Sequence, residues 1–235
     1  QKDYAKFIKL LMPDLIEKLP DFDKAANQLA DAIMNNKNIG ISGDYDCDGN
    51  CSVAVMCRFL MESGVATSRL FPHVPNRERD GYGINSSAVT AMKENNVDLL
   101  LTLDNGTLAF KPIEEAAKGP RKMQVVVVDH HPNQSGQKLP YKALVVNANR
   151  HDAAAEKSKA LEQIPGIGDL AEVGMTFLLC ARTQEILKSK GYYKNTPPDP
   201  QSWLGLVALA TIGDVVNISS AINRSLVAMG LEQIK

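Results

Sequence analysis

Three aspartates at alternate positions follow a short apolar run near the start of the chain. The run, Ile39–Ser42, has the composition of a buried parallel strand, and Gly43 ends it where the chain must turn. If the extended geometry continues, side chains two residues apart point the same way, and the carboxylates meet at the carboxyl end of the strand. The three acids are Asp44, Asp46 and Asp48.

Three anions this close repel one another unless a cation lies between them. Hard divalent ions such as Mg²⁺ and Mn²⁺ favour carboxylate oxygen, so the segment indicates a metal site. The alternative is a solvated acidic turn, because aspartate and glycine are common turn residues. The segment alone leaves both interpretations open.

Apolar runs of strand length alternate with segments of helical periodicity along the chain. After Ile39–Ser42 the expected strands are Ser68–Val74, Val97–Leu103, Gln124–Val128 and Ala143–Val146. The expected helices are Tyr4–Leu19, Phe22–Asn36, Cys51–Ser63, Ser86–Glu94 and Ile113–Lys118, and Asp21 or Asp23 is expected to cap the second of them. This alternation predicts an α/β fold, a parallel five-stranded sheet with helices on both faces. From Ile167 onward the pattern is helical, with helices expected over Leu170–Lys190 and Ser202–Ile212.

Acidic and imidazole side chains also follow two other strands of the expected sheet. Asp104-Asn105-Gly106 follows the third strand, and Asp129-His130-His131 follows the fourth. Parallel α/β sheets bind ligands beyond the carboxyl ends of their strands, and scattered acidic turns have no reason to recur at one edge. The recurrence favours the metal site over the solvated turn.

Composition narrows the class of protein. The chain has 235 residues, 44% of them apolar, which suffices for one large α/β domain or two small ones. A net charge of −1 excludes a strongly basic nucleic-acid binder, and the lack of a membrane-length or signal-peptide apolar run favours the cytoplasm. Zinc is conceivable at Cys47, Cys51 and Cys57, but without a CxxC pair we interpret these residues as small buried thiols.

Four motifs occur in the order and spacing of the DHH phosphoesterase superfamily. They are DYDCDG (Asp44–Gly49), LDNG (Leu103–Gly106), DHH (Asp129–His131) and GDVV (Gly213–Val216). The segment VPNRERDGYG (Val74–Gly83) resembles, more particularly, the catalytic core of the RecJ family. That resemblance implies a metal-dependent phosphodiesterase, a single-strand-specific 5′→3′ DNA exonuclease that acts in repair and recombination.

The resemblance also implies roles for individual residues. Two Mn²⁺ ions, with Mg²⁺ as a substitute, would generate hydroxide from water and neutralise charge at phosphorus during displacement. Asp104 would bridge the two ions and His131 would lie beside the scissile phosphate, while Asp129 could orient a loop or a histidine ring. Tyr82 between Gly81 and Gly83 is either a base-stacking platform or a turn-packing residue. The implied metal ligands are Asp46, Asp48, Asp104, His130 and Asp214. The implied catalytic residues are His131, Asp104 and Asp44, and the implied substrate-binding residues are Arg77, His131, Tyr82 and Gly83.

We expect three parts in the chain: N-terminal helices over residues 1–37, the α/β core over 38–150, and a helical part over 151–235 that completes the domain. The second domain of the family is not expected before Lys235, and the first residue, Gln1, favours an excised core over a minimal relative. Expected partners are single-stranded DNA with a 5′ end, and a single-strand-binding protein or a helicase. The alternatives are a phosphodiesterase of oligoribonucleotides or cyclic dinucleotides, and a non-catalytic replication scaffold.

Overall fold

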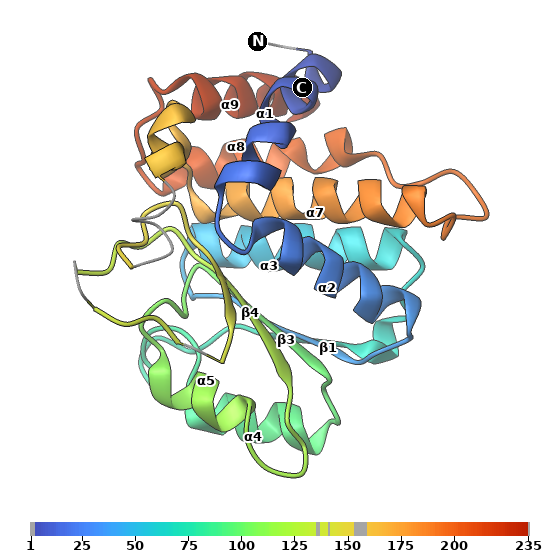
Figure 1. Cartoon of the computed structure of the whole chain (residues 1–235), viewed down its shortest axis with the longest axis vertical. Helices are drawn as coiled ribbons and strands as arrows, with labels where there is room; N and C mark the ends of the chain where they lie inside the picture. Colours follow the sequence, from blue (N-terminus) through green and yellow to red (C-terminus); the bar gives the residue numbers. More distant parts are fainter. Residues whose placement is uncertain (1–2, 135–136, 141, 153–158, 235) are drawn as a thin grey trace.

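A parallel sheet of five strands forms the centre of the molecule (Figure 1). The computed structural model describes residues 3–134, 137–140, 142–152 and 159–234, so Gln1 and Lys235 lie outside the described residues. The strands, in the spatial order β2-β1-β3-β4-β5, are β2 Leu70–His73, β1 Ile39–Ser42, β3 Leu99–Leu103, β4 Gln124–Val128 and β5 Leu144–Val146. The predicted α/β fold class is confirmed.

The order of the strands places a topological switch point at β1. The chain crosses from β1 to β2 on one side, and β3 then pairs with the other side of β1. The loops that leave β1 and β3 therefore diverge, which opens a crevice at the carboxyl edge of the sheet. Both loops carry aspartates of the predicted metal site.

Helices cover both faces of the sheet (Figure 1). Helices α4 Ser86–Glu94 and α5 Phe110–Ala116 lie on one face, and α2 Phe22–Met34, α3 Cys47–Glu62 and α7 Glu172–Ser189 lie on the other. Side chains alternate along β3 accordingly: Leu99, Leu101 and Leu103 join the core beneath α3 and α7, whereas Leu100 joins the core beneath α4 and α5.

A further helical layer packs outside α3 and α7. It contains α8 Leu204–Gly213, α9 Ala221–Ile234 and α1 Tyr4–Lys18. Short 3₁₀ turns occur elsewhere along the chain, at η1 Thr67–Arg69 before β2, η2 Lys159–Gln163, η3 Ile167–Asp169 and η4 Pro200–Trp203. The α9 helix lies beyond the last helix predicted from sequence. Trp203 is fully buried, with its ring centroid 5.8 Å from that of Phe59 and 6.5 Å from that of Phe177. No helix among the described residues has the length and apolar character needed to cross a membrane.

The acidic segment after β1 does not continue as extended chain, so that part of the prediction is wrong. Helix α3 begins at Cys47, because the carboxylate of Asp46 accepts a hydrogen bond from the Gly49 N–H at 3.0 Å and caps the helix. A Cβ at Gly49 would lie 2.5 Å from the Asp44 nitrogen, so glycine permits the tight turn. A helix start, and not a strand, brings the aspartates to one edge.

The predicted capping of α2 by a side chain is also wrong. Asp21 occupies the N-cap position with φ 62°, and its side chain makes no capping hydrogen bond. Its carboxylate instead accepts hydrogen bonds from the Val145 N–H and from Arg150 Nη1, both at 3.2 Å. The Asp21 carboxylate therefore provides a hydrogen-bond partner for a backbone N–H of the edge strand β5, while the backbone of Asp21 itself adopts a left-handed conformation.

Candidate metal centre

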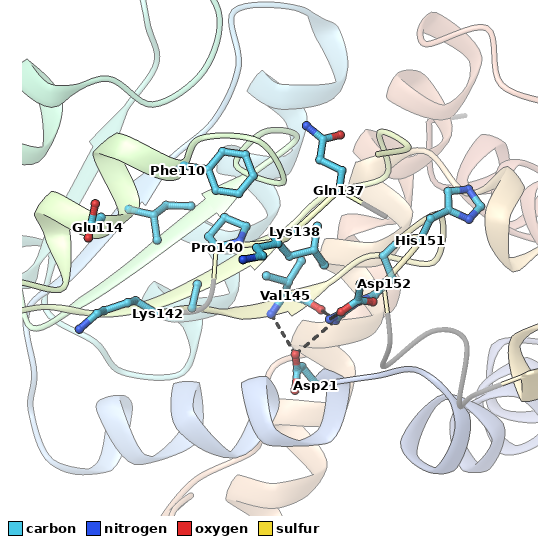
Figure 2. A pocket seen from close by; sticks show the side chains of 14 residues that line it. Asp21, Phe110, Glu114, Gln137, Lys138, Pro140, Lys142, Val145, His151 and Asp152 are labelled. Atoms are coloured by element: carbon cyan, nitrogen blue, oxygen red, sulfur yellow. Dashed lines mark hydrogen bonds and ion pairs between the residues drawn. The ribbon is translucent and has the colours of Figure 1, made fainter. Parts of the chain in front are cut away.

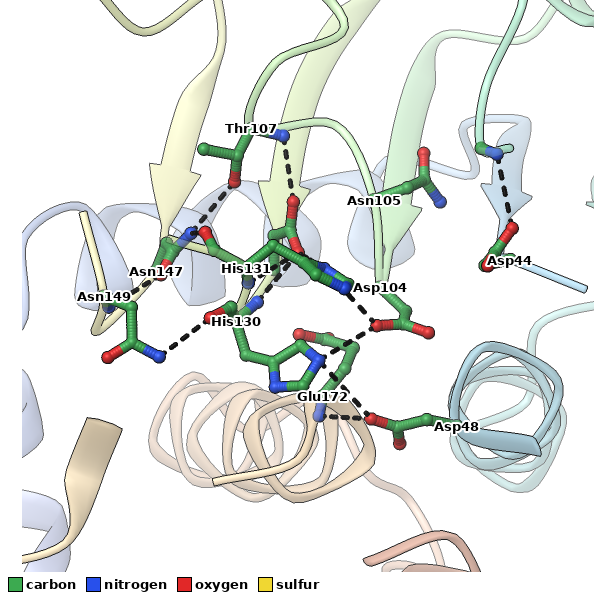
Figure 3. A network of polar contacts seen from close by, with 12 residues as sticks. Asp44, Asp48, Asp104, Asn105, Thr107, His130, His131, Asn147, Asn149 and Glu172 are labelled. Atoms are coloured by element: carbon green, nitrogen blue, oxygen red, sulfur yellow. Dashed lines mark hydrogen bonds and ion pairs between the residues drawn. The ribbon is translucent and has the colours of Figure 1, made fainter. Parts of the chain in front are cut away.

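Carboxylates and imidazoles from four separate segments meet at the carboxyl edge of the sheet. Figure 3 shows Asp44, Asp48, Asp104, His130 and His131 among them. They come from the β1–α3 loop with the first turn of α3, the end of β3, the end of β4 and the end of α8. The ligand-type atoms within each of three groups lie within 4.8 Å of one another. The groups are Asp44 with Asp46 and Asp104, Asp48 with His130 and Asp214, and Asp104 with His130 and His131.

Asp104 lies at the centre of this cluster. Its backbone has φ 64°, a conformation that aspartate tolerates better than most residues, and its carbonyl accepts a hydrogen bond from the Tyr82 hydroxyl at 2.9 Å. The strained turn directs the buried carboxylate toward the other acids. Asp104 is a member of two of the three groups.

The ring of His130 is fixed by its own backbone neighbourhood. Its Nδ1 donates to the carbonyl of Leu170 at 3.1 Å, which leaves Nε2 free of a proton in the neutral tautomer. That Nε2 lies 3.3 Å from Asp104 Oδ1, 3.7 Å from Asp214 Oδ2 and 4.0 Å from Asp48 Oδ2. The imidazole thus presents a ligand atom to three carboxylates.

The electrostatics of the cluster fit a cation. Burial, together with the charges of neighbouring aspartates, raises the pKa of Asp104 to about 7 and that of Asp48 to about 6. Burial lowers the pKa of His130, but Asp104 and the other carboxylates outweigh it and raise that pKa to about 9. Among the described residues, the buried atoms Asp104 Oδ1 and His130 Nε2 have no hydrogen-bond partner, and both are of the type that binds a divalent ion.

Asp48 also binds the start of another helix, a contact that the sequence did not predict. Its two oxygens accept the backbone N–H groups of Glu172 and Val173 at 2.7 and 2.9 Å, so Asp48 caps the first turn of α7. These bonds fix the carboxylate and still leave a lone pair on each oxygen. A residue 124 positions away in the sequence therefore sets the orientation of this predicted ligand.

The other two aspartates of the first motif differ in exposure. Asp46 is exposed and uses one oxygen to cap α3, whereas Asp44 is buried and accepts a hydrogen bond from the Gly83 N–H at 3.3 Å. Burial raises the pKa of Asp44. A Cβ at Gly83 would lie 2.9 Å from the Cβ of Asn105, and φ at Gly83 is 67°. Gly83 therefore closes its loop against Asp44 and Asn105.

Asp129 orients the second histidine of the DHH motif, as expected. His131 Nδ1 lies 2.8 Å from Asp129 Oδ1, and Asp129 Oδ2 accepts the Thr107 N–H at 3.0 Å. Despite burial, the bonds from His131 and Thr107 keep the pKa of Asp129 low, and Asp129 in turn raises the pKa of His131. The Tyr82 hydroxyl is 3.2 Å from the same Nδ1, while the Tyr82 residue is 53% exposed. These contacts of Nδ1 fix the orientation of the His131 ring.

Arg77 lies next to the first motif. Its guanidinium carbon is 5.2 Å from the ring centroid of Tyr45, which stands between Asp44 and Asp46. A stacked guanidinium keeps its planar donors available at its edge. By contrast, Arg79 in the same loop pairs with Asp80 at 2.9 Å.

One buried acid beneath the cluster was not predicted from the sequence. Glu172 is fully buried at the start of α7, its Oε1 accepts the Thr176 hydroxyl at 2.7 Å, and its Oε2 has no partner among the described residues. Burial raises its pKa well above the usual value. The only sequence signal was an acid at the start of an apolar helix, which N-terminal helix turns commonly carry.

One large cavity lies away from this cluster (Figure 2). It has a volume of about 790 Å³ and lies between α5 and the loop before β5, where the buried Arg150 pairs with Asp21 and Asp152. A second cavity of about 630 Å³ is lined by Tyr82, His131 and their neighbours. Asp129 and His131, whose pKa values are perturbed, line the second cavity, which makes it the better candidate for a substrate.

Fold and site together define a class of protein. The profile of the DHH family, N-terminal domain, matches residues 38–211, and the chain belongs to this family. The predicted resemblance is thereby confirmed, and the matched segment begins at the first residue before β1.

Within the family the chain is similar to RecJ proteins. It is 34% identical to the single-stranded-DNA-specific exonuclease RecJ of Dickeya dadantii, over 90% of this chain and 34% of that protein. It superposes with a TM-score of 0.72 on a crystal structure of exonuclease RecJ bound to manganese, at 30% identity over 92% of this chain and 48% of that one. For RecJ of Thermus thermophilus in complex with Mn²⁺ the TM-score is 0.69, at 28% identity over 92% of this chain and 27% of that one. The chain spans about a third of the length of the curated relatives that it matches.

Proposed function

We propose that the chain is the metal-dependent phosphodiesterase core of a single-stranded-DNA-specific 5′→3′ exonuclease acting in DNA repair and recombination. The observation that carries the proposal is the pair of buried ligand atoms, Asp104 Oδ1 and His130 Nε2, which lie 3.3 Å apart without a hydrogen-bond partner among the described residues. The similarity to RecJ proteins supports the choice of single-stranded DNA as substrate.

The metal centre would hold two Mn²⁺ ions, with Mg²⁺ as a substitute. Oxygen-rich ligation with one imidazole suits these ions, and the relatives' structures contain them. Asp104 would bridge the two positions, since it lies within reach of both the Asp44–Asp46 side and the His130 side. When bound, the ions would supply charge neutralisation at phosphorus and activation of water. The proposed ligands are Asp46, Asp48, Asp104, His130 and Asp214.

The chain's own residues would bind and orient the phosphate. Asp129 binds the Nδ1 proton of His131 and raises the pKa of the ring, and in the protonated ring Nε2 can also donate a hydrogen bond to a phosphate oxygen beside the metal centre. The exposed ring of Tyr82, fixed through its hydroxyl, offers a face on which a base can stack. Arg77 would bind the terminal phosphate, and the Gly83 N–H would hold Asp44 in place.

The test is digestion of long single-stranded DNA labelled at one end, by the 235-residue chain, with and without Mn²⁺. We expect mononucleotides to be released from the 5′ end only when Mn²⁺ is present. Cyclic dinucleotides and short oligoribonucleotides are the comparison substrates. Faster hydrolysis of these than of long DNA would assign the core to another activity of its family, and no hydrolysis of any substrate would favour a scaffold.

A further inference from the structure

Two asparagines that follow β5 hold the backbone of the histidine pair (Figure 3). Asn149 Nδ2 donates to the carbonyl of His130 at 2.8 Å, and Asn147 Nδ2 donates to the carbonyl of His131 at 2.9 Å. Because β4 and β5 are parallel neighbours, the residue after β5 lies beside the loop after β4. Each histidine carbonyl thus receives its own side-chain amide.

The same two amides connect the histidines to the groups that fix their rings. Asn149 Nδ2 also donates to the Gly168 carbonyl at 2.9 Å, two residues before Leu170, whose carbonyl accepts His130 Nδ1 at 3.1 Å. The backbone and the ring of His130 are therefore both connected to the segment from Gly168 to Leu170, and Asn149 makes the connection to the backbone. Rotation of that segment would turn Nε2 away from the carboxylates.

Asn147 makes the corresponding connection for His131. Its Nδ2 donates to Thr107 Oγ1 at 2.9 Å, and the Thr107 N–H donates to Asp129 Oδ2 at 3.0 Å. Its Oδ1 accepts the Asn149 N–H at 2.7 Å, so the two asparagines are also joined to each other. Asn147 is fully buried and both polar atoms of its amide are used.

Gly168 offers an independent way to disturb Asn149. A Cβ at Gly168 would lie 2.6 Å from Asn149 Oδ1, so an alanine there must displace the amide. The backbone of Gly168 is not in the left-handed region, so the alanine itself adds no backbone strain. Gly168→Ala therefore moves the amide while keeping its chemistry.

Loop stabilisation alone is the competing explanation, and the chain contains a control for it. Asn133 is buried, as Asn147 is, and belongs to the loop after β4. It bridges that loop to His151 through its Oδ1 at 2.7 Å and its Nδ2 at 3.3 Å. Among the described residues it makes no hydrogen bond to His130 or His131. Asn133 and Asn149 are both asparagines whose amides bridge two loop segments, but only Asn149 binds the backbone of the histidine pair.

We propose that Asn149, supported by Asn147, is a positioning residue that sets the direction of His130 Nε2 and so the affinity of the metal centre for divalent cations. The inference rests on the proposed metal-dependent function of that centre. Partners of a metal-binding histidine commonly change metal affinity by about 10-fold to 100-fold when they are removed. Loss of a loop hydrogen bond elsewhere lowers stability without that effect.

The test measures Mn²⁺ binding to the 235-residue chain by the loss of the free-ion electron paramagnetic resonance signal, together with the thermal midpoint of each variant. We expect Asn149→Ala and Gly168→Ala each to weaken Mn²⁺ binding about 10-fold to 100-fold. Asn133→Ala should lower the thermal midpoint and leave the Mn²⁺ affinity within about twofold of the unaltered chain. If Asn149→Ala does not fold, the Mn²⁺ affinity of Gly168→Ala decides the matter.

Either of two results would overturn this inference and leave the proposed function untouched. One is a Mn²⁺ affinity of Gly168→Ala within about twofold of the unaltered chain, and the other is a loss of Mn²⁺ affinity in Asn133→Ala equal to that in Asn149→Ala. Asp104→Asn in the same assay separates this inference from the proposed function. Binding that Asp104→Asn abolishes but Asn149→Ala spares contradicts only the role of Asn149. An unaltered chain that binds no Mn²⁺ overturns the metal centre and the inference with it.

Discussion

Asp104→Asn should lower the rate of DNA hydrolysis by about three orders of magnitude while the chain remains folded. The substitution removes one charge and changes little else, because asparagine tolerates the left-handed backbone that Asp104 adopts at φ 64°. Alanine at this position would add backbone strain and confuse the two effects. The measurement is single-turnover hydrolysis of end-labelled single-stranded DNA in Mn²⁺.

Stability distinguishes a functional aspartate from a structural one here. Burial and the neighbouring acids raise the pKa of Asp104, so its ionised form destabilises the metal-free chain and Asn should leave the thermal midpoint unchanged or higher. Asp98→Asn, just before the same strand, is the control, because Asp98 accepts the Asn38 N–H at the opposite end of the strand from the cluster. Substantial hydrolysis by a folded Asp104→Asn chain would contradict the metal centre.

Arg77→Ala should lower hydrolysis of 5′-phosphorylated DNA by about 10-fold to 100-fold and affect 5′-hydroxyl DNA much less. The expected loss corresponds to one charge-assisted contact with a terminal phosphate, which the planar guanidinium can bind through two donors. The guanidinium of Arg77 is placed for this by stacking on Tyr45, beside Asp44 and Asp46. Arg77→Lys should recover little, because lysine lacks the paired donors.

Arg79→Ala is the matched control for Arg77. Both arginines are exposed and lie in the same loop, but Arg79 is paired with Asp80. Its removal should leave the ratio of rates on the two DNA ends unchanged. If Arg77→Ala reduced both rates equally, Arg77 would support the loop or the path of the strand and would not recognise the 5′ end.

The sheet could be predicted from sequence because its determinants are local. The runs Ile39–Ser42 and Gln124–Val128 are short and mainly apolar, and the structure places β1 and β4 at these residues. The aspartates and histidines at the strand ends were recognisable for the same reason. Parallel strands bring their carboxyl ends to one edge, so the positions in sequence predicted a cluster in space.

The contacts that orient the cluster depend on residues far apart in sequence. Nothing near Asp48 indicates that the N-terminus of α7 donates two hydrogen bonds to it. Periodicity likewise gave no signal for Asn147 and Asn149, whose amides act only after β5 has paired with β4. Local patterns predicted which residues gather, and tertiary packing decided how each one points.

The central claim is that the cluster around Asp104 and His130 binds divalent cations, and a thermal unfolding titration with Mn²⁺ tests it most directly. A cation that binds only the folded chain, at a concentration about 100-fold above its dissociation constant, adds about 2.7 kcal/mol of stability. For a chain of this size that corresponds to a rise of roughly 5–10 °C in the thermal midpoint. We predict this rise for the unaltered chain and its loss in Asp104→Asn, with the ionic strength matched by NaCl. An unchanged thermal midpoint across a millimolar Mn²⁺ titration, or an equal rise in both chains, would contradict cation binding at this cluster.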